Sequence, residues 1–354
     1  MKNASNRFLR IFAGTLLACL FLAGCMSRPH ISSDSDEHVS YSIELTTGPT
    51  PWNHADFDAG RGKFTFAVFS DLTGGERDGI FSVAAEQIRL LRPEFVMNVG
   101  DLIEGGTEDR TQLTSEWDAF DQRASRIIGP VFYAGGNHDL INTVQWEVWG
   151  ERYGPRYYHF RYQDVLFLVL DTEDNDPERQ QAIYEARAAA FERVTSEGWG
   201  IWSETEYAEM QETHTGTIGV EQSDFFIEKI REHSDVRWTF VFMHKPAWLK
   251  EGEQNFLAIE NALSGSNYTV FNGHNHDYKY RSRKGRDYIQ LATTGGVQLA
   301  GKEKAVDHIT MVTVSDTGVD IANVEVSGIF DKTGNLPLNG NSLCFEFAKC
   351  GAEQ

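Results

Sequence analysis

Short apolar runs, rich in branched and aromatic residues, recur along the middle of this chain. They occupy residues 64–69, 95–99, 131–133, 165–170, 238–243 and 268–271. Runs of this length and composition are typical of strands that are buried on both faces of a sheet. Between the first runs, apolar residues recur at helical spacing, as at Ile80, Ala84 and Ile88. Because strands and helices alternate, the sequence predicts an α/β fold with a largely parallel sheet.

The pattern changes after residue 291. Two apolar runs, at residues 309–314 and 319–326, are separated by a short polar segment that ends in Gly318. Two runs joined in this way are typical of a β-hairpin. We therefore expect a second sheet with more antiparallel pairing.

The residues that follow the apolar runs are polar and of few kinds. Asp71, Asp101, the segment 135–139, His244 and the segment 273–276 each stand close behind a run. In open α/β sheets, ligands gather at the carboxyl ends of the strands, so we expect these side chains to meet. Asp, Asn and His are hard or borderline metal ligands. A single such residue would be a helix cap or a core histidine. So many polar groups crowded together would repel one another or lack bonding partners unless cations were bound among them.

This ordered series resembles the calcineurin-like metallophosphoesterase superfamily, and the resemblance extends from residue 63 to about residue 300. It implies an α/β fold in which two mixed sheets form a β-sandwich flanked by helices. It also implies two divalent metal ions, Mn, Fe or Zn, with Asp101 as the bridging ligand. The metal ligands that the resemblance implies are Asp71, Asp101, Asn137, His244, His274 and His276.

The first motif departs from the family pattern. The family commonly has Asp-x-His there, whereas this chain has Asp71, Leu72 and Thr73. We expect Glu104 or Thr73 to face the first metal instead, directly or through water. Relatives that resemble purple acid phosphatases have a tyrosine at the position of Glu104. The alternative is that Glu104 is a helix-start carboxylate without metal contact.

The implied chemistry is attack on phosphorus by a metal-bridging hydroxide. Two adjacent cations lower the pKa of a bridging water, orient it and neutralise phosphoryl charge. His138 is expected to be the general acid for the leaving oxygen, with Asp139 orienting its ring and raising its pKa. Arg77 is a candidate for binding the substrate phosphate. The alternative for Arg77 is an ion pair with Glu76 or Asp78.

The N-terminus is typical of an export signal. Basic residues precede an apolar stretch at residues 11–23, which is too short for a comfortable transmembrane helix. Residues 22–25, Leu-Ala-Gly-Cys, resemble the lipobox of bacterial lipoproteins. The resemblance implies a signal peptide at residues 1–24 and a lipid on Cys25, which would anchor the protein to the bacterial outer membrane on its periplasmic side. The alternative is an ordinary signal peptide with an incidental cysteine.

The remaining segments complete the predicted domain organisation. Residues 25–60 show no sustained period and suit a tether, residues 61–330 form the phosphoesterase domain, and residues 331–354 form a C-terminal tail. In an oxidising compartment Cys344 and Cys350 would form a disulfide in that tail. The alternative is a pair of free thiols.

An acidic segment interrupts the domain at about residues 173–215. Its alanine-rich part predicts a helical insertion between two strands of the core. One hypothesis is that the insertion is only a solvated acidic surface. The other is that it forms a lid whose Trp199, Trp202 or Tyr207 contacts substrate.

The predicted function is a metal-dependent phosphoesterase that hydrolyses small phosphate mono- or diesters. The chain has 52 acidic and 32 basic side chains and a formal net charge of −20, which would repel a nucleic acid polymer. The expected partners are therefore a small phosphate ester and, through the lipid, a membrane; the sequence predicts no oligomeric state. The alternative function is a non-catalytic binding lipoprotein on the same fold, which the altered first motif would allow.

Overall fold

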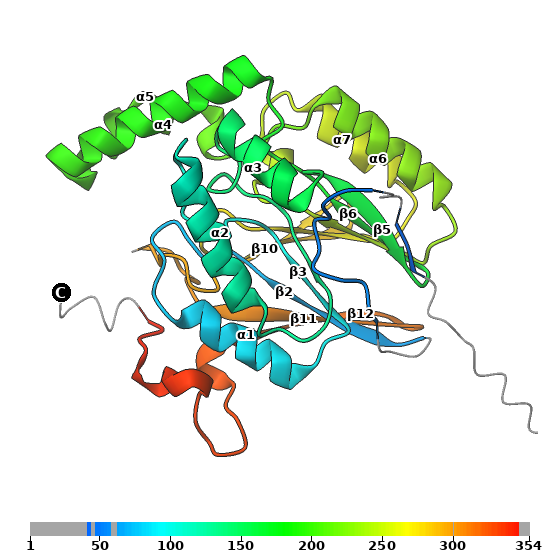
Figure 1. The fold of residues 1–354 in the computed structure, drawn as a ribbon. Helices are drawn as coiled ribbons and strands as arrows, with labels where there is room; N and C mark the ends of the chain where they lie inside the picture. The colour runs from blue at the N-terminus through cyan, green and yellow to red at the C-terminus, as the bar shows by residue number, and fades with distance from the viewer. Residues whose placement is uncertain (1–40, 44–46, 58–61, 300, 347–354) are drawn as a thin grey trace, which may run out of the picture. The chain divides into compact units, whose positions relative to one another are not determined.

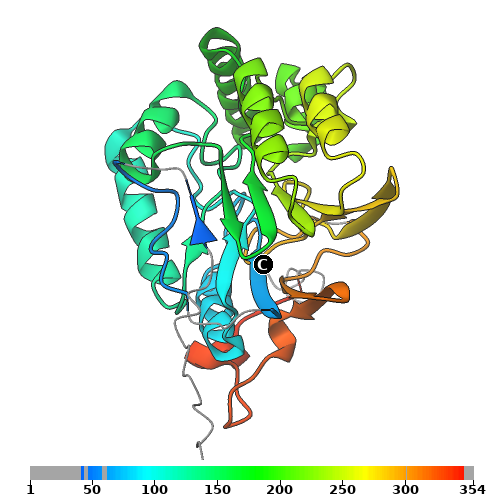
Figure 2. The same ribbon diagram turned by 90° about the vertical axis from the view of Figure 1, so that its right-hand side faces the viewer.

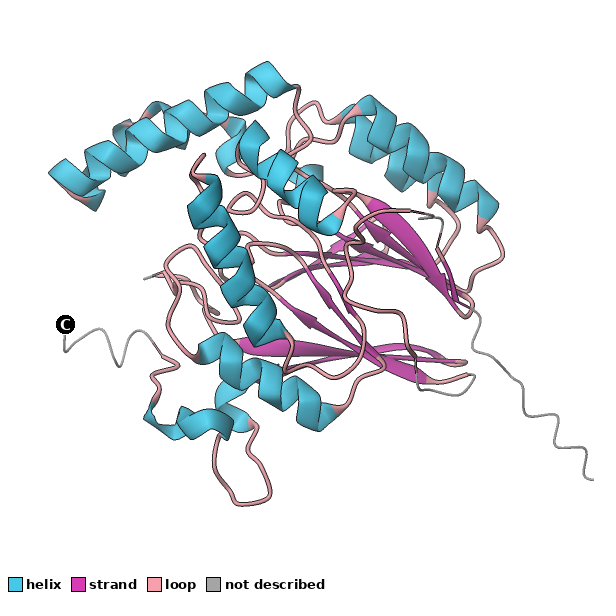
Figure 3. Cartoon of the chain, in the orientation of Figure 1, coloured by secondary structure: helices cyan, strands magenta, loops and turns pink. Residues whose placement is uncertain are grey.

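The structure is a computed structural model that describes residues 41–43, 47–57, 62–299 and 301–346. Its strands form two stacked sheets (Figure 3). The first sheet has seven strands, in the order β1 (Tyr41–Ser42), β5 (Tyr158–Tyr162), β6 (Val165–Val169), β7 (Trp238–Phe242), β8 (Tyr268–Asn272), β10 (Arg286–Gln290) and β9 (Lys279–Arg283). The second has five, in the order β12 (Gly318–Glu325), β11 (His308–Ser315), β2 (Phe64–Phe69), β3 (Phe95–Asn98) and β4 (Val131–Phe132).

Both sheets are mixed. Strands β6, β7, β8 and β10 run parallel in the first sheet, and β2, β3 and β4 run parallel in the second. The hairpin of β11 and β12 is antiparallel, as its short turn predicted. The predicted α/β fold, with two mixed sheets flanked by helices, is therefore confirmed.

Helices lie outside the two sheets (Figure 1). They are α1 (Ile80–Leu91), α2 (Arg110–Ala124), α3 (Thr143–Tyr153), α4 (Pro177–Glu197), α5 (Glu206–Glu209), α6 (Val220–Glu232) and α7 (Gln254–Ala262), with short 3-10 helices at η1 (Trp199–Glu204), η2 (Gln211–Thr213), η3 (Ala247–Leu249), η4 (Val326–Gly328) and η5 (Pro337–Ser342). Helices α6 and α7 lie side by side on the seven-stranded sheet in both views (Figures 1 and 2). There Phe226 and Ile259 belong to the same buried cluster as Val241 of β7.

The core between the sheets is aromatic. Phe66 and Phe95 of the five-stranded sheet stack with their ring centroids 5.3 Å apart, and Phe160 and Phe167 of the facing sheet stack at 4.6 Å. Phe66 meets Phe167 across the sandwich, edge to face, at 5.4 Å. Because protein interiors pack as densely as organic crystals, these rings fix how the sheets stack and therefore where their strand ends lie.

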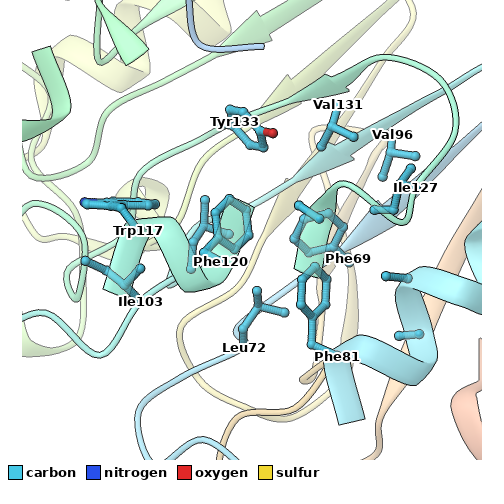
Figure 4. Close-up of a cluster of buried hydrophobic side chains, with 14 of the residues drawn as sticks. Phe69, Leu72, Phe81, Val96, Ile103, Trp117, Phe120, Ile127, Val131 and Tyr133 are labelled. Carbon is cyan, nitrogen blue, oxygen red and sulfur yellow. The ribbon is translucent and has the colours of Figure 1, made fainter. Parts of the chain in front are cut away.

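A second cluster fills the space between the five-stranded sheet and helices α1 and α2 (Figure 4). The ring of Phe81 on α1 stacks on Phe120 of α2 with centroids 6.0 Å apart, and it lies 5.1 Å from the Phe69 ring of β2. The apolar face that the sequence predicted for α1 is buried here. The two helices thereby support the loops that follow β2 and β3.

Part of the predicted tether belongs to the folded domain. Strand β1 pairs with β5, and Phe57 packs against Tyr162 with ring centroids 4.7 Å apart. Trp52 forms an isolated bridge with Phe132 of β4. The boundary predicted at residue 60 is therefore wrong, because the apolar side chains before it cover an edge of the aromatic core.

Part of the predicted tail is also ordered against the domain. Leu343 and Phe345, which follow η5, pack on the cluster that contains α1. Cys25 and Cys350 lie outside the described residues, so the lipid attachment and the Cys344–Cys350 disulfide stay predictions. Among the helices that the structure describes, none combines the length and the apolar character needed to cross a bilayer.

Candidate metal centre

The ends of five strands bring the predicted ligands together. In chain order the ligands are Asp71 after β2, Asp101 after β3, Asn137 after β4, His244 after β7, and His274 and His276 after β8. Ligand atoms of Asp101, His244 and His274 all lie within 4.8 Å of one another. The same holds for Asp71, Asp101 and His276. The structure therefore places two ligand groups side by side, joined by the carboxylate of Asp101.

Two of the histidines are fixed by backbone carbonyls of the sandwich. His244 Nδ1 lies 2.8 Å from the Val99 oxygen, and His276 Nδ1 lies 2.6 Å from the Val297 oxygen. Since a carbonyl only accepts, Nδ1 carries the proton in each ring and Nε2 faces the carboxylates. Metal-binding histidines in proteins almost always have their other ring nitrogen held in this way.

The third histidine is fixed by the acidic insertion. His274 Nε2 lies 2.8 Å from the backbone oxygen of Thr213, the last residue of η2. This contact leaves Nδ1 of His274 for the ligand group. The insertion therefore reaches the candidate metal centre through its main chain.

The electrostatics of the centre suit a cation. His244 Nε2 lies 3.2 Å from Asp101 Oδ2 and 3.0 Å from Asn137 Oδ1, and all three residues are buried. Burial lowers the pKa of His244, but the Asp101 carboxylate, with Asp71 and the Val99 carbonyl, outweighs burial and raises that pKa to about 9. Burial likewise raises the pKa of Asp101, but His244 and His138 together outweigh it and hold the pKa well below its usual range. A metal ion binds such a group in place of the proton.

The backbone around the centre is strained. Four candidate ligands adopt positive φ, with values of 39° at Asp71, 58° at Asp101, 75° at His274 and 54° at His276. A residue other than glycine in this region costs on the order of 1–3 kcal/mol, and such residues cluster at functional sites. Close approach adds to the constraint, since a methyl group on Gly136 would lie 2.3 Å from Asp101 Oδ1. The folded chain therefore accepts local backbone strain in order to bring these side chains together.

Asp139 holds the Asp101 loop and not the His138 ring. Its carboxylate is fully buried and accepts hydrogen bonds from backbone N–H groups, namely those of Asp101 and Gly136 at 2.8 Å, Leu102 at 2.9 Å and Ile103 at 3.1 Å. The prediction that Asp139 orients His138 is wrong, because these donors occupy both carboxylate oxygens. Asp139 is a positioning residue for the shared ligand.

His138 is oriented by a backbone carbonyl instead. Its Nδ1 lies 2.7 Å from the Glu104 oxygen and carries the proton, which leaves Nε2 facing the site. A methyl group on Gly74 would lie 3.5 Å from this Nε2 and 3.2 Å from His276 Cε1, so the two rings flank Gly74. Burial lowers the pKa of His138, and the Arg187 guanidinium adds to that effect. The predicted rise in the pKa of His138 is therefore wrong.

Comparison with known proteins identifies the family. The model for the calcineurin-like phosphoesterases matches residues 64–278. The chain belongs to this family. No curated protein matches the sequence.

Solved structures of phosphatases share the fold of this calcineurin-like phosphoesterase. A dimetal phosphatase from Danio rerio is 14% identical, with a TM-score of 0.50 over 74% of this chain and 99% of that chain. A purple acid phosphatase from seeds of yellow lupin (Lupinus luteus) is 14% identical, with a TM-score of 0.51 over 76% of this chain and 53% of that chain. At such low identity the similarity shows the fold alone.

In this phosphoesterase, the polar side chains at and near the altered first motif form hydrogen bonds within the protein. The Thr73 hydroxyl donates to the Ile103 carbonyl at 2.8 Å. Glu104 Oε1 accepts from the N–H groups of Gly75 and Glu76 at 3.0 and 2.7 Å. The expectation that Thr73 or Glu104 faces the first metal is therefore corrected, since both tie the loop after β2 to the loop after β3. Glu104 lies in a loop, so the helix-start alternative fails as well.

Arg77 is held by partners within the protein. Its Nη2 donates to Asp307 Oδ1 at 2.5 Å, and its Nε donates to the Gly296 carbonyl at 3.0 Å. The alternative pairing with Glu76 or Asp78 is therefore wrong, whereas the substrate contact stays a prediction. Asp307 is 230 residues away along the chain, so local sequence could not indicate this partner.

The acidic insertion approaches the site through a residue that the sequence did not single out. Trp199 is 67% exposed, whereas Tyr207 is buried in a small cluster with Ile183. Arg187 of α4 places Nη2 at 3.5 Å from His138 Nε2. Aromatic residues stand out in an acidic segment, whereas nothing in the sequence distinguishes Arg187 from Arg179 and Arg193 of the same helix.

Proposed function

We propose that this calcineurin-like phosphoesterase is a metal-dependent enzyme that hydrolyses small phosphate mono- or diesters. The observation that carries the proposal is the pair of ligand groups that share Asp101. Asp71 and His276 with Asp101 would hold one divalent ion, and His244 and His274 with Asp101 would hold the other. Carboxylate oxygens and imidazole nitrogens in one centre suit Mn, Fe or Zn.

Residues around the centre would support the hydrolysis of phosphate esters by fixing the ligands and supplying a proton donor. Two divalent ions bound there would activate water and neutralise charge on the phosphoryl group. Backbone carbonyls fix the three histidines, and Asp139 fixes the loop that bears Asp101. His138 presents Nε2 beside His276, and we assign to it proton transfer to the leaving oxygen. The negative charge of a bound phosphate ester favours the second ring proton that this role requires.

The charge of the chain supports a small substrate. A formal net charge of −20 opposes the approach of a long polyanion such as a nucleic acid. A single phosphate group needs only the local field of the occupied centre. We therefore propose nucleotide-sized or smaller esters as substrates.

Hydrolysis by reconstituted protein tests the proposal. Chelator-treated protein should hydrolyse neither p-nitrophenyl phosphate nor bis-p-nitrophenyl phosphate, and addition of Mn, Fe or Zn should restore hydrolysis of at least one of them. The chelated protein without added metal is the control. Protein that binds these metals yet hydrolyses neither ester would contradict the proposal and favour a non-catalytic binding protein on this fold.

We also propose that the enzyme is exported and anchored by a lipid on Cys25. The support is the lipobox-like segment 22–25 behind the apolar stretch 11–23. The full chain expressed in a bacterium should partition into the detergent phase of a Triton X-114 extract, and Cys25→Ser should move it to the aqueous phase. Equal partition of both proteins would contradict the anchor.

A further inference from the structure

We infer that Arg187 of the acidic insertion binds the phosphoryl group of the substrate and favours dianionic phosphomonoesters over phosphodiesters. The inference rests on the proposed function and deepens it. It assigns specificity to helix α4, which contributes no side chain to either ligand group.

Arg187 is a buried charge without a carboxylate partner among the described residues. The residue is 9% exposed. The guanidinium lies over the Phe191 ring, 4.7 Å from the centroid, and its polar contact is the 3.5 Å approach to His138 Nε2. Removing a charge from water without a counter-charge is costly. A protein that keeps such a charge beside a candidate active site is built to receive an anion there.

The other arginines of α4 show that this arrangement is particular to Arg187. Arg179 pairs with Glu212 at 2.8 Å, and Arg193 pairs with Glu197 at 3.0 Å. The insertion contains many carboxylates, so the lack of a carboxylate partner for Arg187 does not result from a shortage of acidic residues. The fold instead turns this guanidinium towards His138.

Helix α4 holds Arg187 firmly in that position. The buried residues of the helix form one face, namely Gln180, Ile183, Arg187, Ala190 and Val194. Gln180 Nε2 donates to the backbone oxygens of Leu140 and Ile141 at 3.1 and 3.0 Å. These carbonyls follow directly after His138 and Asp139, so the helix is docked on the loop that carries the proposed proton donor.

The loop after β3 is shaped around the guanidinium. A methyl group on Gly106 would lie 2.3 Å from Arg187 Nη1, and Gly106 adopts a φ of 63°. Any other residue at this position would push Arg187 away from His138. The loop that begins with the shared ligand Asp101 therefore leaves room for this side chain.

The position of Arg187 relative to His138 and His276 indicates what it would bind. The Arg187 guanidinium contacts His138, and the His138 and His276 rings flank Gly74. An anion at the ligand groups would therefore meet the guanidinium on the His138 side. Arginine presents several N–H donors in a fixed fork that matches phosphate oxygens.

The charge of the substrate decides which ester benefits. A phosphomonoester dianion has three non-bridging oxygens, whereas a diester monoanion has two and carries one negative charge less. The third non-bridging oxygen and the additional negative charge allow the monoester to form a stronger charge-assisted hydrogen bond with the guanidinium than a diester can form. Arg187 should therefore stabilise the monoester more than the diester.

Comparison of the two esters tests the inference. With metal-loaded protein, Arg187→Gln should lower kcat/KM for p-nitrophenyl phosphate by about 100-fold, the usual effect of losing one charged donor. The value for bis-p-nitrophenyl phosphate should stay within about fivefold. Arg187→Lys keeps the charge but loses the fork, so it should give an intermediate loss on the monoester. Arg193→Gln, the same change on the exposed side of α4, is the matched control and should alter neither value.

Calorimetry gives a second readout that does not depend on turnover. Inorganic phosphate at pH 8 should bind metal-loaded Arg187→Gln at least about tenfold more weakly than wild type, while dimethyl phosphate should bind both alike. Metal content and melting temperature of each variant are measured in parallel, and Arg187→Lys replaces Arg187→Gln if the latter does not fold. Equal effects on monoester and diester, or no effect on either, would overturn the inference. Failure of the wild type to hydrolyse both esters would instead overturn the proposed function.

Discussion

Asp101→Asn should empty both ligand groups and lower phosphoester hydrolysis by at least about 1000-fold, since a bound metal supplies several kcal/mol of transition-state stabilisation. The substitution keeps the size of the side chain but removes the one negative charge that both groups share. It also removes the main group that offsets burial and raises the pKa of His244. Metal content by plasma mass spectrometry and kcat/KM for p-nitrophenyl phosphate measure the two effects.

The control for this substitution is Asp118→Asn on α2. Asp118 is an exposed aspartate that pairs with Arg152 at 2.6 Å, so its replacement should change neither metal content nor activity. Retention of both ions by Asp101→Asn would show that Asp101 is not the ligand that joins the two groups.

Lys245→Met should destabilise the fold by about 3–5 kcal/mol, the usual effect of breaking a buried ion pair. Lys245 Nζ lies 2.8 Å from Glu173 Oε1, and both side chains are 1% exposed. Burial lowers the pKa of Lys245, but Glu173, with smaller effects of Tyr207 and Asp101, outweighs burial and raises the pKa. Without Lys245 the buried Glu173 carboxylate would be left without its counter-charge. Urea unfolding at neutral pH measures the loss.

The location of this pair explains why the effect should extend to the insertion. Glu173 also forms a β-bridge with Thr217, so the two ends of the insertion meet beside Lys245. The double variant Lys245→Met with Glu173→Leu removes both charges and should recover most of the lost stability. Lys332→Met, at an exposed lysine, should cost less than about 0.5 kcal/mol. A similar small cost for Lys245→Met would contradict a structural role for the pair.

The central strands could be predicted because the apolar composition of each run indicates that it is buried. The runs that form β2, β3, β4, β7 and β8 are mostly apolar, and a predicted ligand follows each of them. Since parallel strands place their carboxyl ends at one edge, position in the sequence was enough to predict convergence. Other elements gave no such signal. Strand β9 is exposed along nearly its whole length and contains three basic residues among five, so its composition did not suggest a strand.

The hydrogen bonds that hold the predicted ligands in place could not be predicted, because their partners are distant in the sequence. The carbonyls of Val99, Thr213 and Val297 that fix the histidines belong to main chain, which carries no sequence signature. Asp139 stands next to His138 in sequence, which suggested a contact between the side chains. In the structure it turns back to the loop after β3. Neighbours along the chain were in this case a poor guide to neighbours in space.

The central claim is that two cations share Asp101, and anomalous scattering from crystals of manganese-loaded protein tests it most directly. Data collected at the manganese edge should give two peaks, one in the group of Asp71, Asp101 and His276 and one in the group of Asp101, His244 and His274. Peaks elsewhere, or none at these residues in protein that retains manganese, would contradict the account.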